Sequence, residues 1–115
     1  MGRMDRYKDE ERARLAVNLV AYALGVSSHE ILEAKRGSAK ASLGRHIAMY
    51  VVYVGFGISL ARVATAFARD RSTVAYACHQ VEDRRDDPVF DSWLDVLERT
   101  LRQAAVLSST PDTTV

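Results

Sequence analysis

Residues 59–78 read Ser59-Leu-Ala-Arg-Val-Ala-Thr-Ala-Phe-Ala-Arg-Asp-Arg-Ser-Thr-Val-Ala-Tyr-Ala-Cys78. The pattern predicts two short helices joined by a tight polar turn, with arginines and hydroxyls at the start of the second helix. Ser59 and Asp70 suit the two N-cap positions, because their side-chain oxygens can accept from backbone N–H groups of the first turn. A helix-turn-helix has this layout, and its second helix enters the major groove of DNA. We therefore expect a helix-turn-helix at about residues 59–85.

The two expected helices of this motif have distinct faces. Where they would cross, the first helix has the small and apolar residues Val63, Ala64 and Phe67. At positions i, i+3, i+4 and i+7 the second helix has the apolar residues Val74, Ala77, Cys78 and Val81. Its other face carries Arg71, Ser72, Ala75, Tyr76, His79 and Gln80. Such side chains can hydrogen-bond base edges and phosphates, although a helical hairpin with an ordinary polar outer face would show the same pattern.

Helical patterns also cover the rest of the chain. We expect helices at about residues 5–24, from Ser27 or Ser28 to Ala34, at about 43–54 and from Pro88 onward. The last of these has an apolar face made of Phe90, Leu94, Leu97 and Leu101. No segment alternates with a period of two over a useful length, so no sheet is expected. The sequence predicts an all-α helical bundle of about six helices, with one domain over residues 1–107 and a disordered tail over 108–115.

The composition excludes several classes of protein. With 115 residues, of which 48% are hydrophobic, the chain is long enough for one domain with a buried core. No apolar run reaches the roughly 18 residues that span a bilayer, so no membrane partner is expected. The charge-dense residues 1–14 do not resemble a secretory signal, and the single cysteine, Cys78, cannot form an internal disulfide. We expect a cytoplasmic, nucleoid-associated protein.

Neither a metal site nor a catalytic site is expected. His29, His46 and His79 fall on three different expected helices, with no cysteine or carboxylate at metal-ligand spacing. Cys78 falls on an apolar face and is expected to be a small core residue. No nucleophile–base pair stands out, and the sequence has no Gly-x-x-x-x-Gly-Lys-Ser/Thr loop for a nucleotide. We therefore predict a protein that is not an enzyme and needs no cofactor.

The net charge of +1 conceals an uneven distribution along the chain. Residues 35–85 carry nine basic and three acidic side chains, which gives a net charge of +6. Residues 1–34 have a net charge of −1, and residues 86–115 have a net charge of −4. A polyanion responds to the local field rather than to the total charge, so the central block favours a nucleic-acid partner. A set of ordinary solvated arginines is the alternative.

Several separated segments carry a family resemblance. Lys35-Arg36 ends a short expected helix, Arg45-His-Ile-Ala-Met-Tyr50 lies in the next one, and Arg69-Asp-Arg-Ser-Thr-Val74 begins the second helix of the motif. With Ser59-Leu60 and Phe67, these segments resemble the C-terminal DNA-binding domain of the bacterial replication initiator DnaA. They resemble the family's basic loop, its Arg-Gln-Ile-Ala-Met-Tyr helix and its Arg-Asp-His-Ser/Thr-Thr-Val signature. The resemblance runs from about Val26 to Val81 and suggests a stand-alone reading head without the initiator's ATPase.

This resemblance implies double-stranded DNA as the partner and gives roles to individual residues. Base contacts in the major groove are expected from Arg69, Asp70, Arg71, Ser72 and Thr73 and, on the same exposed face, from Tyr76. Backbone contacts are expected from Lys35, Arg36, Lys40 and Arg45, with Leu60 close to the groove. Asp70 and Thr73 keep a second role open, because both can belong to the N-cap of the helix.

The chain departs from the family pattern in three respects. Arg71 stands where the family has histidine, and the turn between Phe67 and Arg69 is one residue shorter than usual. Leu43 stands where the family commonly has an arginine that reaches the minor groove. We expect DNA binding to be retained, with a target sequence that need not be the initiator's own box.

The leading hypothesis is a bacterial transcriptional regulator that binds double-stranded DNA sequence-specifically. One alternative is a replication modulator that occupies initiator boxes and competes with the initiator. Another is a helical adaptor whose former DNA-binding face now binds protein, which the acidic C-terminal part favours. A homodimer through the N-terminal helix or through the helix of Phe90 to Leu101 is also considered, although both apolar stripes can instead pack onto their own domain.

Overall fold

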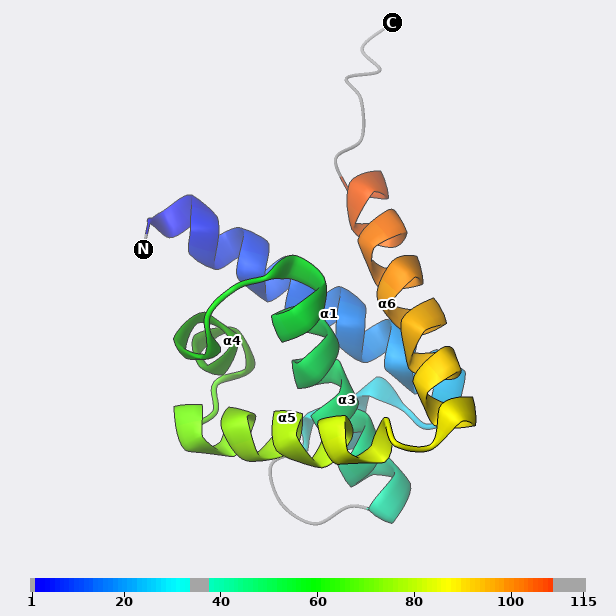
Figure 1. The fold of residues 1–115 in the computed structure, drawn as a ribbon. Coiled ribbons are helices and arrows are strands. Elements are labelled where there is room, and N and C mark those ends of the chain that lie inside the picture. Colours follow the sequence, from blue (N-terminus) through cyan, green and yellow to red (C-terminus); the bar gives the residue numbers. More distant parts are fainter. Residues whose placement is uncertain (1, 34–37, 109–115) are drawn as a thin grey trace, which may run out of the picture.

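The computed structural model describes residues 2–33 and 38–108 of the chain. These residues form helices and no strands, as Figure 1 shows: α1 (Arg3–Leu24), α2 (Ser28–Leu32), α3 (Ala39–Phe56), α4 (Leu60–Phe67), α5 (Arg71–Arg84) and α6 (Pro88–Leu107). The prediction of an all-α bundle of about six helices is confirmed. Lys35 and Arg36 lie outside the described residues, and so does the expected tail after Ser108.

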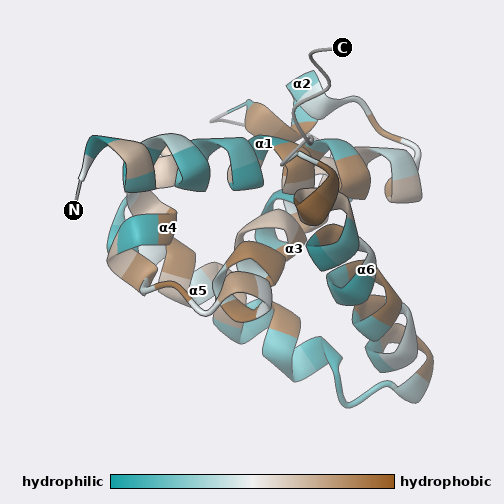
Figure 2. Cartoon of the chain, turned by 90° about the horizontal axis from the view of Figure 1, so that it is seen from above, coloured by the Kyte–Doolittle hydropathy of each residue, from teal (hydrophilic) through white to brown (hydrophobic). Residues whose placement is uncertain are grey.

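The central element of the bundle is α3. It contacts all five other helices, and Figure 2 shows it enclosed by α1, α4, α5 and α6. Its middle is buried on every side, over the run Ile47, Ala48, Met49, Tyr50, Val51 and Val52. A helix that is apolar nearly all round is typical of the interior of a bundle. Every other helix is therefore positioned by what it packs against on α3.

Four of the described helices, α2, α3, α4 and α6, begin at a side chain that accepts a hydrogen bond from the first turn. Ser59 accepts from the N–H of Arg62, which confirms this predicted cap, and Asp87 accepts from the N–H of Val89 where the last helix was expected to begin. Ser38 caps α3 in the same way, and the helix therefore begins at Ala39. The predicted start of this helix at about residue 43 is wrong, because the small polar residues before it are its first turn rather than a loop.

Two glycines end helices by adopting a left-handed conformation. Gly25 ends α1 with a φ of 71°, directly after the helix expected at about residues 5–24, and Gly57 ends α3 with a φ of 63°. This conformation costs glycine least because it has no Cβ. The helix expected to end near residue 54 therefore continues through Gly55 to Phe56.

A third glycine allows α2 and α3 to approach each other closely. A Cβ on Gly44 would lie 3.1 Å from Cδ1 of Ile31, a side chain that is fully buried. The contact fixes α2 against the first half of α3. It thereby places the last carbonyls of α2 beside the side chain of Arg45, one residue further along α3.

The outer helices close the core from two sides. On α6 the predicted apolar face turns inward, with Leu94, Leu97 and Leu101 buried and Phe90 half-buried. On α1 the apolar residues of the second half pack against α3. The stripe that the sequence offered as a dimer surface on α6 thus lies within its own domain. None of the described helices is long and apolar enough to cross a membrane.

Candidate nucleic-acid interface

The predicted helix-turn-helix is formed by α4 and α5 (Figure 1). After α4, Ala68 adopts a φ of 54°, a left-handed conformation that is uncommon for a residue with a Cβ. The N–H of Arg69 donates to the carbonyl of Ala64 at 3.0 Å, so a carbonyl of the last turn of α4 has a hydrogen-bond donor. The short turn over residues 68–70 therefore leads directly into the first turn of α5, and the chain needs no glycine to make it.

The two faces of α5 are those expected from its sequence. Val74, Ala77 and Val81 are buried, and Cys78 is half-buried. Burial raises the pKa of the Cys78 thiol to about 11, in keeping with a packing role. The opposite face is exposed over Arg71, Ser72, Thr73, Tyr76, His79 and Gln80. A row of donors and acceptors thus faces solvent from the first turn of the helix onward.

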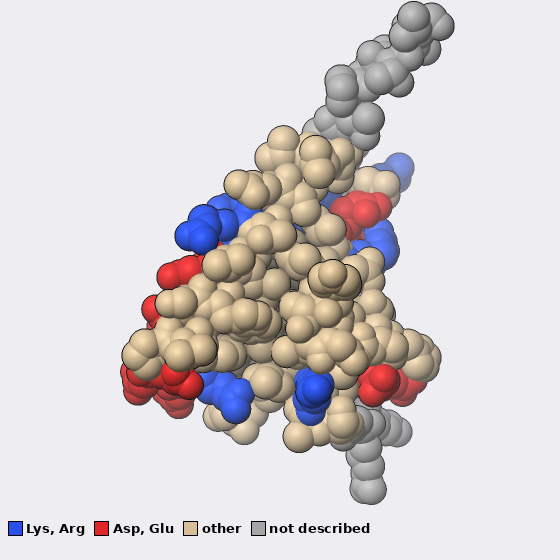
Figure 3. Space-filling model, turned by 90° about the vertical axis from the view of Figure 1, so that its right-hand side faces the viewer, with Lys and Arg blue, Asp and Glu red and all other residues tan. Residues whose placement is uncertain are grey.

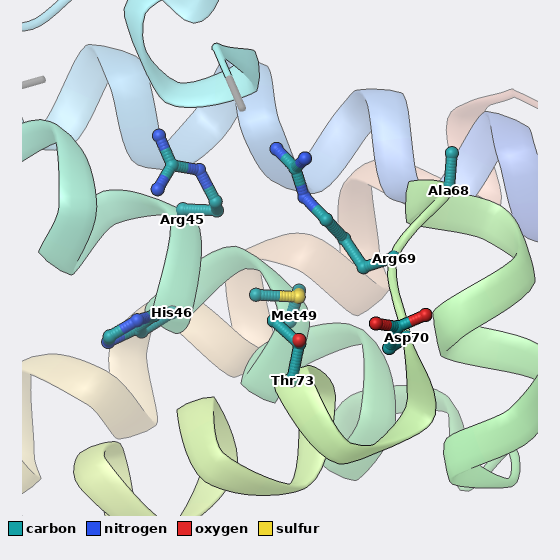
Figure 4. A pocket seen from close by; sticks show the side chains of 7 residues that line it. All are labelled: Arg45, His46, Met49, Ala68, Arg69, Asp70 and Thr73. Atoms are coloured by element: carbon teal, nitrogen blue, oxygen red, sulfur yellow. The ribbon is translucent and has the colours of Figure 1, made fainter. Parts of the chain in front are cut away.

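An open pocket of about 580 Å³ lies beside the start of α5 (Figure 4). Its lining comes from α3, from the turn and from α5: Arg45, His46, Met49, Ala68, Arg69, Asp70 and Thr73. Met49, which is fully buried, and Ala68 form the apolar part of the wall, while the other five residues bring polar side chains. The pocket therefore joins Arg45, a predicted backbone contact, to three predicted base contacts.

Arg45 and Arg69 both point toward the end of α2. Nε of Arg45 donates to the carbonyl of Ile31 at 2.8 Å, and Nη2 donates to the carbonyl of Glu33. Nη2 of Arg69 donates to the carbonyl of Leu32 at 3.1 Å. Three successive carbonyls at the negative end of a helix thus accept from two guanidinium groups. Sequence analysis missed this role, which links α2, α3 and the turn.

The two arginines also affect each other and their neighbour. Burial, and then the charge of Arg69, lower the pKa of Arg45, while Glu33 opposes this shift. Burial, and then the charge of Arg45, lower the pKa of His46. Burial is the larger cause of both shifts, and repulsion by the neighbouring positive charge adds to it. An incoming anion would relieve this repulsion, so the pocket suits a phosphate or another anionic group.

His46 and Tyr76 connect the pocket to the exposed face of α5. Their rings lie edge to face, with centroids 5.9 Å apart. His46 is half-buried and also lines the pocket. Tyr76 remains 59% exposed. The aromatic contact positions Tyr76, whose hydroxyl and ring face remain open to a ligand.

Asp70 occupies the N-cap position of α5, but its carboxylate accepts no hydrogen bond from the helix. The expectation that this carboxylate accepts from an N–H of the first turn is therefore wrong. The side chain is exposed, and both residues line the pocket (Figure 4). Its carboxylate is available to accept a hydrogen bond from a ligand such as a cytosine amine.

The remaining predicted contacts lie around this centre. Lys40 is exposed in the first turn of α3, and Leu60 is half-buried at the first residue of α4. Neither residue lines the pocket. Among residues 2–33 and 38–108, no three His, Cys, Asp or Glu side chains are placed to hold a metal ion together.

Two arginines of the basic block have carboxylate partners. Arg62 makes two hydrogen bonds of 2.9 Å to Asp9, whose side chain is buried. Arg85 contacts Asp91, Asp95 and Glu98, and its Nη1 also donates to the hydroxyl of Tyr50 at 3.0 Å. Sequence counting included both arginines in the net charge of the block. Pairing removes them from the field that a polyanion would meet.

Fold and site together define a helix-turn-helix domain with an arginine-lined pocket beside its second helix. Residues 15–81 match the family described as bacterial dnaA protein helix-turn-helix, which is more than half of the chain. The chain therefore belongs to the DnaA helix-turn-helix family. This confirms the resemblance that the Arg45 and Arg69 segments indicated.

Individual relatives agree with the family. The chain is 37% identical over 68 residues to the chromosomal replication initiator protein DnaA of Thermodesulfovibrio yellowstonii, an alignment that covers 58% of this chain and 15% of that protein. A crystal structure of a DNA replication initiation factor superimposes with a TM-score of 0.75 at 30% identity, over 86% of this chain and 30% of that one. The replication initiator DnaA bound to AMPPCP and single-stranded DNA gives a TM-score of 0.73 at 29% identity, with the same coverage. The chain thus spans less than a third of these relatives.

Proposed function

We propose that this chain is a sequence-specific double-stranded-DNA-binding protein, with the N-terminal part of α5 in the major groove. The observation that carries the proposal is the exposed first turn of α5 beside the pocket of Arg45 and Arg69. Recognition helices of this class contact base edges with their N-terminal residues. Membership of the DnaA helix-turn-helix family supports the same partner.

Within this proposal, the residues divide by the groups that they can reach. Arg71, Ser72, Thr73 and Tyr76 project from the exposed face of α5 and are assigned to base edges, together with Asp70 and Arg69. Arg45 and Lys40 are assigned to phosphates, together with Lys35 and Arg36, and Leu60 is assigned to the edge of the groove. The hydrogen bond from Arg69 to Leu32 is exposed, so a base or phosphate can replace the carbonyl as its acceptor.

A bacterial transcriptional regulator is the biological role that we favour, with the protein located at the nucleoid in the cytoplasm. Arg71 is the residue that supports a target of its own. It replaces the family's histidine at an exposed position in the first turn of α5. An arginine there can donate two hydrogen bonds to guanine, so the preferred sequence is expected to differ from an initiator box.

The second candidate function is replication control by competition for initiator boxes. The identity of 37% over 68 residues to a chromosomal replication initiator protein favours it, as does the match of residues 15–81 to the family. A competition assay at fixed salt concentration, comparing an initiator box with a scrambled duplex, distinguishes replication control from transcriptional regulation. Equal affinity for an initiator box and for a scrambled duplex would exclude the second candidate.

A helical protein adaptor is the alternative from another class. It is separated from both DNA-binding roles by fluorescence anisotropy with a random duplex. DNA binding requires an anisotropy increase whose affinity falls steeply with salt, because bound phosphates release counterions. Absence of any increase at low salt would favour the adaptor.

The deciding experiment is selection of bound sequences from a random duplex pool, followed by affinity measurement at fixed salt. We expect one enriched motif, and we expect a single-stranded version of that motif to compete weakly. The proposal fails if no motif is enriched, or if single-stranded DNA competes as well as the duplex.

A further inference from the structure

His46 is the one histidine among the residues that line the pocket beside α5 (Figure 4). It follows Arg45 on α3 and stands where the family's Arg-Gln-Ile-Ala-Met-Tyr helix has glutamine. Its ring is half-buried and makes the edge-to-face contact with Tyr76 on the exposed face of α5. A group that can gain a proton therefore lies within the surface proposed for DNA.

The surroundings of His46 disfavour its protonated form in the free protein. The charged and titratable groups that face it come from α3, from the turn and from α5: Arg45, Arg69, Asp70 and Tyr76. In the part of the chain that the structure describes, no carboxylate lies at ion-pair distance from its ring. Burial, and then the charge of Arg45, lower the pKa of His46 from the ordinary value of 6.5. The ring is therefore neutral at neutral pH.

The side of the molecule that carries α6 attracts a polyanion less than the pocket does. In Figure 3 this side shows a broad area without charged side chains, bordered by basic and acidic side chains together. Neighbouring opposite charges weaken the field that a polyanion meets. In the pocket, by contrast, Arg45 and Arg69 donate to neutral carbonyls and keep their charge. We therefore expect a phosphate of the duplex at the pocket.

A phosphate in the pocket reverses the balance of charge around His46. Its negative charge attracts an imidazolium ring and has no such attraction for the neutral ring. Protonation also turns both ring nitrogens into donors, whereas the neutral ring has one donor and one acceptor. Phosphate oxygens accept hydrogen bonds from donors of this kind. The protonated form of His46 is consequently favoured once DNA is bound.

We propose that His46 takes up a proton when duplex DNA binds, so that the affinity of this chain for DNA increases as the pH falls. The inference rests on the proposed function, because it requires a duplex at the pocket. Linkage is reciprocal: if DNA favours the protonated ring, the protonated protein binds DNA more tightly. The additional affinity is complete below the pKa of His46 in the free protein, and it is lost as the pH rises through the pKa of His46 in the complex.

Fluorescence anisotropy from about pH 8 to about pH 5.5, with the duplex selected from the random pool, measures this linkage at fixed salt concentration. We expect the dissociation constant of the wild type to fall about three- to tenfold over this range, since a pKa that rises by about one on binding corresponds to about tenfold in affinity. His46→Gln removes the titrating ring, and its affinity should depend less on pH.

His29→Gln is the matched control, because the side chain of His29 is 84% exposed on α2 and does not line the pocket. This variant should keep the pH profile of the wild type. Circular dichroism at each pH verifies that the variants are folded. The inference is overturned if wild type and His46→Gln share one pH profile, or if His29→Gln flattens the profile as much as His46→Gln does.

Side-chain NMR of the histidines in the wild type tests the same inference without a substitution. The midpoint of the His46 titration should move to higher pH when the duplex is bound. A midpoint that stays in place or moves to lower pH, in a protein that binds the duplex, overturns the proton uptake and leaves the proposed function intact. A duplex that fails to bind at every pH overturns both.

Discussion

Four arginines of the central basic block illustrate two different uses of the same side chain. Arg45 and Arg69 donate to backbone carbonyls at the end of α2 and border an open pocket. Arg62 and Arg85 donate to carboxylates on α1 and α6. A neutral carbonyl leaves the charge of a guanidinium in place, whereas a carboxylate cancels it. The first pair can therefore attract an anion, and the second pair holds helices together.

This difference locates the surface proposed for DNA more sharply than the count of basic residues does. The open arginines lie where α2, α3 and the turn before α5 meet. The paired arginines link helices of the bundle. Arg62 on α4 bonds to Asp9 on α1, and Arg85 after α5 bonds to carboxylates on α6. Substitutions of the arginines that border the pocket should therefore change DNA affinity, whereas substitutions of the paired arginines should change the free energy of unfolding.

The largest effect is expected from replacing Arg85, one of the two arginines that are paired with carboxylates. Replacing Arg85 with Gln leaves Glu98, which is 8% exposed, without its guanidinium partner. Removing one partner of a buried ion pair is strongly destabilising, so we expect the free energy of unfolding to fall by about 2–4 kcal/mol. Urea denaturation measures the change. Arg84→Gln, on the neighbouring exposed position, is the control, and a loss no greater than that of the control would contradict the structural role of Arg85.

Arg71 is exposed in the first turn of α5, next to the pocket that Arg45 and Arg69 border. Arg71→Ala is expected to lower affinity for the selected duplex by about 1–3 kcal/mol and to relax preference at one base position. Fluorescence anisotropy on single-base variants of the selected site measures both effects. Arg84→Ala removes the same charge from the far end of the helix and should leave base preference unchanged. Identical base preference in wild type and Arg71→Ala would mean that another face of α5 reads the DNA.

Lys40 should have a smaller and less specific effect. It is exposed on α3 and is assigned to a phosphate, so Lys40→Ala should weaken all duplexes alike. We expect the slope of log affinity against log salt to decrease by about 1. Lys8→Ala removes an equal charge from α1 and should leave that slope as it is in the wild type. If Lys40→Ala changed the ratio of affinities for two different sequences, Lys40 would not be a phosphate contact.

The smallest effect at neutral pH concerns Tyr50, which bonds to Arg85 and to Glu82. Burial, and then the hydrogen bond to Glu82, raise the pKa of Tyr50 to about 12 from an ordinary value of 10.0. The folded state therefore keeps a proton that the unfolded chain loses. This contribution to stability is complete below about pH 10 and disappears as the pH rises to about 12.

Urea denaturation between pH 9 and 12 checks this sign. The raised pKa of Cys78 produces a slope of the same direction, so the comparison is made in a Cys78→Ala background. Tyr50→Phe should flatten the remaining decline in stability, and Tyr22→Phe, at an 88% exposed position, should not. A steep decline that persists in Tyr50→Phe would assign the alkaline sensitivity to another group.

Local sequence patterns were sufficient to predict most helices of the fold. The cap at Ser59, the left-handed Gly25 and the spacing of Val74, Ala77 and Val81 each depend on residues within one or two helical turns. Such signals can be read without knowing the tertiary structure. The error at the start of α3 has the same origin, since Ser38 and the small residues after it suit both a loop and a capped helix.

The pairing of the arginines could not be predicted in this way. Arg62 and Asp9 are 53 positions apart, and Arg45 meets carbonyls 12 and 14 positions before it. These contacts depend on how α1 packs against α4 and how Gly44 admits α2. The candidate contacts of α5 could be named from sequence, but which arginines retain an uncompensated charge was decided by tertiary packing.

The central claim is that the open arginines, and not the paired ones, face DNA. It is tested most directly by titrating ¹⁵N-labelled protein with the selected duplex and following the backbone amide shifts. The account predicts that the largest changes fall at residues 69–76 and in the first half of α3, with α6 nearly unchanged. Largest changes on α6 or around Arg85, with residues 69–76 unaffected, would contradict it.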